Sequence, residues 1–136
     1  MKKLFILLII SGLVVFIACK KEDKSERFRL LTGPVWVTDS LLADGVDASG
    51  PGMLLVKFKG EAEFNEDGTG TFGVYKGTWY FAYHETQIVI YSDSLLIPLV
   101  TLIKELTNTS LKITTSVPNL SNLSDTINIR MTFKAK

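Results

Sequence analysis

The sequence has little of the chemistry on which most enzymes depend. Its 136 residues include one cysteine, Cys19, and one histidine, His84. A single cysteine excludes an internal disulfide. A general base needs an oriented partner, and neither a Gly-x-Ser-x-Gly nor a His-Glu-x-x-His motif is present. We therefore predict no enzymatic activity and no cofactor, and we interpret His84 as a loop residue.

An excess of charge of one sign is also lacking. The formal net charge is +1, and removal of Lys2 and Lys3 with the first 18 residues leaves 13 basic against 14 acidic residues. The surface of such a chain lacks the positive field that nucleic-acid binding needs. The sequence therefore predicts no nucleic-acid partner.

A metal site is not indicated either. Asn65, Asp67 and Thr69 alternate like the first ligands of a calcium loop. An EF-hand-type loop then needs a bidentate carboxylate in its twelfth place, where this chain has Lys76. We predict a hairpin turn without a metal.

No apolar run is long enough to cross a bilayer. The longest extends from Leu4 to Ala18 after Lys2 and Lys3, and as a helix it would rise about 22 Å, short of a hydrocarbon core of about 30 Å. A basic start, a short apolar stretch and a small final residue are typical of a signal peptide. We predict that residues 1–18 are a cleaved signal peptide, with an uncleaved membrane anchor as the alternative.

The end of this run has a more specific meaning. Phe16-Ile17-Ala18-Cys19 resembles the lipobox of bacterial lipoproteins, although Phe16 stands where Leu or Val is usual. The resemblance implies that the Cys19 thiol receives a diacylglycerol, that the chain is cut before Cys19, and that fatty acyl groups such as palmitate anchor it to a membrane. Several acyl chains hold a protein on a bilayer essentially permanently.

A charged segment follows the lipobox. Residues 20–27 contain no apolar side chain and cannot support a core, so residues 19–27 are predicted to be a flexible tether. Cys19-Lys20-Lys21-Glu22-Asp23 also resembles the acidic export signal of surface lipoproteins of Bacteroidota. That resemblance implies a place in the cell envelope, on the outer membrane and exposed at the cell surface. A solvated linker is the alternative.

From residue 28 onward the hydrophobic pattern has a period of two. In the clearest case Ile127, Ile129, Met131 and Phe133 alternate with polar residues, as in a half-buried β-strand. The stretch 95–106 also fits helical spacing, and we interpret it as a strand with a short helix as the alternative. The predicted strands are 36–42, 53–64, 69–75, 77–83, 87–91, 95–106, 111–117 and 127–134.

The connections between these strands are short. Ala43-Asp44-Gly45 and Asn65-Glu66-Asp67-Gly68 place glycine where a hairpin requires a positive φ, and 47–52 is expected to form a longer loop. Eight sequentially connected strands can close into an antiparallel up-and-down barrel that leaves no exposed edge. We predict an all-β barrel over residues 28–136, with an open sandwich as the alternative.

Several segments resemble lipocalin-like lipoproteins of Bacteroidota. They are Leu31-Thr32-Gly33-Pro34-Val35-Trp36, the run from Phe64 to Phe72 followed by Gly77-Thr78-Trp79, and Ile103 to Thr107 leading into Leu111-Lys112-Ile113. The resemblance covers residues 33–134 and implies a lipocalin-like barrel. In that family the first tryptophan packs against an arginine of the last strand. Here an extra residue precedes Trp36, and alternation puts Arg130 on the wet face, so we expect Trp36 in the core and Arg130 in solvent.

The barrel interior is the candidate binding site. Trp79, Phe81 and Tyr83 share one face of a predicted strand, and in a closed barrel they could line a cavity for a small apolar ligand. Core packing is the alternative. A cavity of a few hundred Å³ that opens near 47–52 would favour a ligand, whereas a filled core with an exposed apolar patch would favour a protein partner.

Three short patterns suggest surface modification. Asp39-Ser40-Leu41, Asp93-Ser94-Leu95 and Asp125-Thr126-Ile127 resemble the acceptor of the Bacteroidota O-glycosylation system, with Ser40, Ser94 and Thr126 as the acceptors. A pattern of three residues also arises by chance.

Taken together, the sequence predicts a lipid-anchored envelope lipoprotein whose barrel binds a small apolar or amphipathic molecule. The alternative is a non-enzymatic protein-interaction or structural subunit of an envelope complex.

Overall fold

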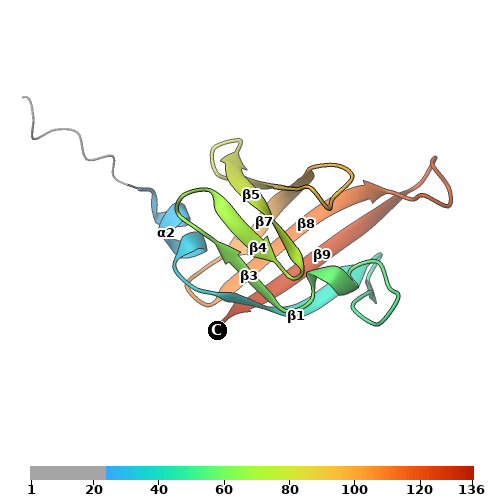
Figure 1. Ribbon diagram of the computed structural model, residues 1–136, viewed down its shortest axis with the longest axis horizontal. Coiled ribbons are helices and arrows are strands. Elements are labelled where there is room, and N and C mark those ends of the chain that lie inside the picture. The colour runs from blue at the N-terminus through green and yellow to red at the C-terminus, as the bar shows by residue number, and fades with distance from the viewer. Residues whose placement is uncertain (1–23) are drawn as a thin grey trace, which may run out of the picture.

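The structure is a computed structural model that describes residues 24–136. Figure 1 shows a sheet rolled into a barrel, with a short helix at one end and a long hairpin that projects from the other. The predicted signal peptide 1–18, the lipidation site Cys19 and the tether as far as residue 23 lie outside the described residues.

The regular elements are one short α-helix, one 3₁₀ turn and nine strands within residues 24–136. The helix α2 spans Glu26–Thr32, and the 3₁₀ helix η1 spans Val56–Phe58. The strands are β1 (Trp36–Ala43), β2 (Val46–Asp47), β3 (Glu61–Phe64), β4 (Thr69–Phe72), β5 (Tyr75–Ala82), β6 (Gln87–Ser92), β7 (Leu99–Leu106), β8 (Ser110–Pro118) and β9 (Thr126–Ala135).

The strands close on themselves. The sheet order is β2-β1-β3-β4-β5-β6-β7-β8-β9, and β1 also pairs with β9 from Trp36↔Ala135 to Ala43↔Ile129. Strand β2 pairs only with β1, so β1 and β3 to β9 make an eight-stranded antiparallel barrel. The predicted barrel is confirmed. The open sandwich is wrong, because the pairing of β1 with β9 closes the eight-stranded sheet on itself.

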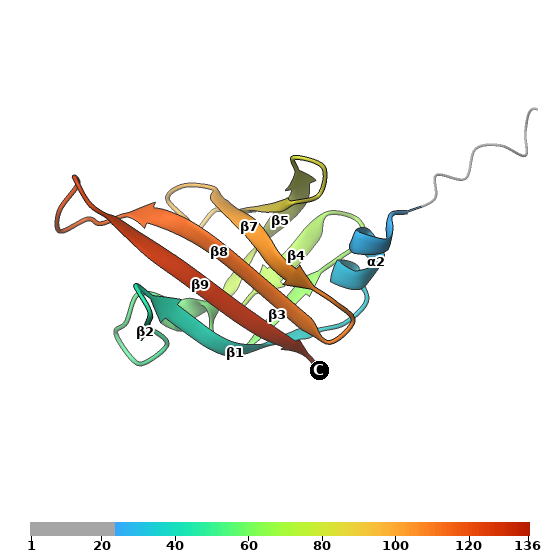
Figure 2. The ribbon, with the colours of Figure 1, turned by 180° about the vertical axis from the view of Figure 1, so that it is seen from behind.

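The up-and-down order sends alternate turns to opposite ends of the barrel. The β3–β4, β5–β6 and β7–β8 turns lie at the end covered by α2, which we call the helix end. The other turns and the segment 48–60 lie at the opposite end, which we call the distal end (Figures 1 and 2).

Helix α2 is an element that the sequence pattern did not predict. The Ser25 Oγ accepts a hydrogen bond of 3.1 Å from the Phe28 N–H and so caps the first turn. Leu31 is fully buried. Ser25 and Arg27, which the charge run assigned to the tether, donate to the Glu85 side chain and to its carbonyl oxygen respectively. The folded domain therefore begins before Phe28.

Two predicted strands have different bounds in the structure. Only 61–64 of the predicted strand 53–64 pairs in the sheet, because η1 and a bend at Gly60, whose φ is 121°, interrupt the first half. The ambiguous stretch 95–106 contains strand β7, which begins at Leu99 after Pro98. The strand interpretation is confirmed there, and the helix alternative is wrong.

The core runs through the whole barrel. Trp36 is fully buried, and its Nε1–H donates to the Leu31 carbonyl oxygen at 3.0 Å, which satisfies the one polar atom of the ring. Arg130 is exposed on the outer face of β9. Both expectations for this pair are confirmed. The other buried side chains include Leu41, Ala62, Phe64, Phe72, Ile88, Ile90, Leu111, Ile113, Met131 and Phe133.

Candidate functional site

The barrel interior, where the sequence placed a ligand, is filled by side chains. A cavity of about 10 Å³ lies among Phe64, Phe72, Ile113 and Met131, which is room for about one water molecule. The expected mouth near 47–52 is closed, because Ala48 and the nearby Leu55 pack into the core. Apolar side chains therefore fill the barrel from the helix end to the distal end.

The three predicted ligand-lining residues do not form one surface. Trp79 is 5% exposed, and its Nε1–H donates to the Asn65 carbonyl oxygen at 3.0 Å. Phe81 packs edge-on against Trp79 with ring centroids 5.3 Å apart. The prediction for Tyr83 is wrong: its side chain is 76% exposed, because its φ of 49° begins the β5–β6 turn and ends the alternation of the strand.

Apolar side chains gather instead on the outside of the barrel. We call this surface the wall patch: Tyr80, Val89, Tyr91, Val100 and Leu102. Register places Tyr80, Val89 and Val100 in one outward-facing row across β5, β6 and β7. Val89 is only 5% exposed although it lies outside the core cluster, so its neighbours in the patch cover it. The Tyr80 and Tyr91 rings stack at 6.1 Å, and hydrogen bonding to Tyr91 raises the pKa of Tyr80.

An open hollow of about 540 Å³ continues the wall patch toward β1. Leu102, Thr114, Arg130 and Leu42 follow one another across four paired strands and line it. The Ser116 hydroxyl donates to Asn128 Oδ1 at 2.9 Å along the same surface. Arg130 forms no ion pair with any residue from 24 to 136. The hollow therefore combines a few aliphatic side chains with hydroxyl and amide groups and one cation that forms no ion pair within residues 24–136.

The sequence analysis missed this surface, although a signal for it exists. Residues 88–91, Ile-Val-Ile-Tyr, are apolar on both faces of β6, and residues 99–103 of β7 are nearly so. A strand that loses its alternation is typically covered on both sides. In β6 the inward residues Ile88 and Ile90 reach the core, and the outward residues belong to the wall patch.

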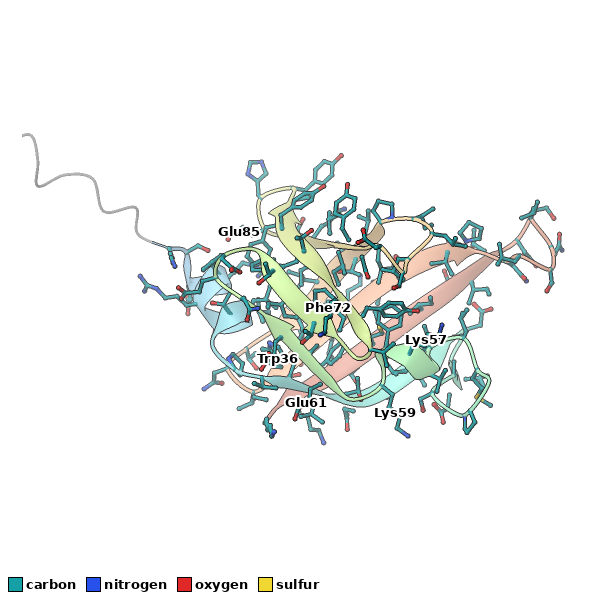
Figure 3. All side chains as sticks on the ribbon, viewed as in Figure 1. Trp36, Lys57, Lys59, Glu61, Phe72 and Glu85 are labelled. Carbon is teal, nitrogen blue, oxygen red and sulfur yellow. The ribbon has the colours of Figure 1, made fainter. Side chains whose placement is uncertain are left out.

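The polar groups singled out in the sequence serve local structure. The Asp67 carboxylate accepts hydrogen bonds from the Thr69 backbone N–H and hydroxyl, which lower the pKa of Asp67 and fix the predicted hairpin turn. His84 lies in the exposed β5–β6 turn, as expected of a loop residue. Figure 3 shows the neighbouring Glu85 beside α2. Within residues 24–136 no group of His, Cys, Asp and Glu is placed to hold a metal ion.

The three predicted glycosylation acceptors differ in environment. Ser94, in the β6–β7 loop, and Thr126, at the start of β9, are exposed at the distal end. Ser40 lies in β1, where its hydroxyl shares a hydrogen bond of 2.7 Å with the Thr132 hydroxyl. The two distal positions are accessible, and their modification stays a prediction.

No protein family matches the chain, and no curated protein matches it significantly. In the part of the chain from residue 24 onward, no helix has the length and hydrophobicity to span a bilayer.

Proposed function

We propose that this chain is a lipid-anchored protein of the bacterial envelope whose barrel binds a protein partner through the wall patch and the hollow beside it. The observation that carries the proposal is the location of the apolar surface. The cavity among the core side chains Phe64, Phe72, Ile113 and Met131 has a volume of only about 10 Å³, while tyrosine, valine and leucine side chains lie uncovered on the outer wall. A rigid, filled barrel that displays such a patch is suited to docking rather than to catalysis.

The anchor rests on the sequence. A short apolar stretch, a lipobox-like ending and the only cysteine of the chain coincide at Cys19. The likeness to lipocalin-like lipoproteins of Bacteroidota, together with the acidic residues after Cys19, supports attachment to the outer membrane with exposure at the cell surface. An interior ligand would need to displace packed side chains, so we assign binding to the outer wall.

The composition of the surface fits a protein partner. Tyrosine and arginine are enriched among the residues that dominate protein–protein binding energy. The wall patch supplies Tyr80 and Tyr91, and the hollow supplies Arg130. We expect the partner to present an apolar segment together with a carboxylate that reaches Arg130. A partner that buries this arginine must pair its charge.

Site-specific cross-linking in the producing cells tests the binding surface. We expect a photo-reactive amino acid at Val100 to give one discrete protein adduct, which Tyr80→Ser or Arg130→Glu abolishes. The matched control is Thr71, an outward residue of β4 on another part of the wall. Equal adducts from both positions, or none from Val100, would contradict the assignment of the wall.

The anchor has a separate test. Cys19→Ser should leave an uncleaved precursor that incorporates no radiolabelled palmitate. Normal processing of this variant would count against lipidation and would leave the cross-linking result unaffected.

A further inference from the structure

The two ends of the barrel differ in their chemistry. Of the exposed large hydrophobic residues described, only Tyr83 lies in a turn of the helix end. The distal end carries aliphatic side chains on several separate loops: Val46, Met53, Leu54, Val74, Leu96, Ile97, Leu120 and Leu123. Neither the proposed partner surface nor the core accounts for these residues.

The β8–β9 tip presents two of them most prominently. It repeats a triplet, Asn119-Leu120-Ser121 and Asn122-Leu123-Ser124. In each triplet the asparagine Oδ1 accepts a hydrogen bond from the backbone N–H of the serine, at 3.0 Å and 3.3 Å. The intervening leucines are left 80% and 78% exposed. Figures 1 and 2 show this tip projecting beyond the rest of the barrel.

Most backbone N–H groups of the tip are hydrogen-bonded within the loop. Backbone N–H groups of Asn119, Asn122 and Asp125 donate to carbonyl oxygens within the loop, in addition to the two serine N–H groups held by asparagine side chains. Between Lys112 and Arg130 the only charged residue is Asp125. Insertion of the leucines would bury no lysine or arginine. Five of the seven backbone N–H groups from 119 to 125 would stay hydrogen-bonded within the loop, whereas those of Leu120 and Leu123 make no such bond.

We propose that the β8–β9 tip inserts Leu120 and Leu123 into the surface of a lipid bilayer. Leucine and serine are under-represented among the residues that dominate protein–protein interfaces, and the tip has no aromatic residue or arginine. A fluid bilayer accepts isolated protruding side chains without a complementary pocket. Because the tip has no positive charge, the bilayer it enters need not be anionic. Insertion of the tip does not require lipidation of Cys19, and the fluorescence measurement below reports on the tip alone.

A local fluorescence measurement on the full chain tests the insertion. An environment-sensitive fluorescent amino acid replaces Ser121, and excess phosphatidylcholine vesicles are added. We expect the emission to shift to the blue and to be quenched by lipids brominated in the acyl chain. Leu120→Ser combined with Leu123→Ser should raise the lipid concentration for half-maximal shift by about three- to eightfold, from the transfer free energies of two leucines.

The matched control places the same fluorophore at Thr109, in the β7–β8 turn at the helix end, where no shift is expected. An unchanged emission at position 121 overturns the proposal, as does an equal shift at position 109. A shift that appears without lipid and grows with protein concentration would indicate a second copy as the occupant instead. A shift that needs anionic lipid and is lost in salt would indicate electrostatic attraction and would also overturn it.

Discussion

Replacement of Ile113 by alanine measures whether the barrel interior is a packed core or a ligand cavity. Ile113 is 1% exposed on β8 and borders the small cavity beside Phe64, Phe72 and Met131. The substitution removes three carbon atoms, which at about 0.8 kcal/mol each amounts to about 2.4 kcal/mol of transfer free energy. The void left by the side chain adds to this loss. The facing rings of Phe64 and Phe72 belong to strands of a closed barrel and cannot move inward to fill it. We expect a loss of about 3 to 4 kcal/mol in the free energy of unfolding.

Urea unfolding of the purified chain, followed by tryptophan fluorescence, measures this loss as a lower midpoint at an unchanged slope. The melting temperature should fall by about 10 to 15 °C. Thr114→Ala is the matched control, because Thr114 is the next residue and lines the outer hollow. Its effect should be within about 0.5 kcal/mol. A loss below about 1 kcal/mol for Ile113→Ala would refute the packed core, since a side chain lining a wet cavity gives up little on truncation.

Three further changes test the fold. Ile129→Asp puts a carboxylate at a 5% exposed core position and should cost several kcal/mol in urea unfolding; an unchanged melting temperature would show the face assignment of β9 to be wrong. Gly77→Ala should separate β5 from β6, because the new Cβ would overlap the Tyr91 carbonyl oxygen, and unaltered amide hydrogen exchange of β6 would contradict this. Hydrogen bonds from Thr69 lower the pKa of Asp67, so their stabilisation is complete above the unfolded value of 3.8 and is lost as the pH falls through the lower folded value. The stability difference between the native chain and Asp67→Ala should therefore shrink below pH 3.8, and a constant difference down to pH 2 would argue against the bond.

Much of the barrel could be predicted because most of its strands expose one face to solvent and bury the other, so that apolar and polar residues alternate along them. The alternation around Ile129 and Met131 assigns both faces of β9, and the glycines at 45 and 68 mark two hairpins. This information is local to each strand. It assigned Trp36 to the core and Arg130 to solvent correctly, against the arginine partnership implied by the family resemblance.

The missed elements depend on contacts between distant residues. The first turn of α2 is a charged run, and the bonds from Ser25 and Arg27 to Glu85 join residues about 60 positions apart, whereas the Ser25 cap itself is local. The segment 53–60 was predicted as part of a strand, yet its Leu55 packs on the core and the segment does not pair in the sheet. Neither contact leaves a periodic trace in the sequence.

The candidate site was misplaced for a similar reason. The alternation that groups Trp79, Phe81 and Tyr83 holds only while the backbone stays extended, and three successive residues of positive φ begin at Tyr83. The wall patch becomes visible only when β5, β6 and β7 are placed side by side, since each contributes one or two of its residues. Sequence periodicity predicts which face a residue takes, and the strand register decides which residues meet.

Native mass spectrometry of the protein extracted from its producing cells tests the central claim, that a filled barrel is held on a membrane by lipid at Cys19. The predicted mass is that of residues 19–136 with a diacylglycerol-based modification on the first residue and no further small molecule. A non-covalent ligand of a few hundred daltons that stays bound after detergent is removed, or a chain without lipid at its first residue, would contradict the account.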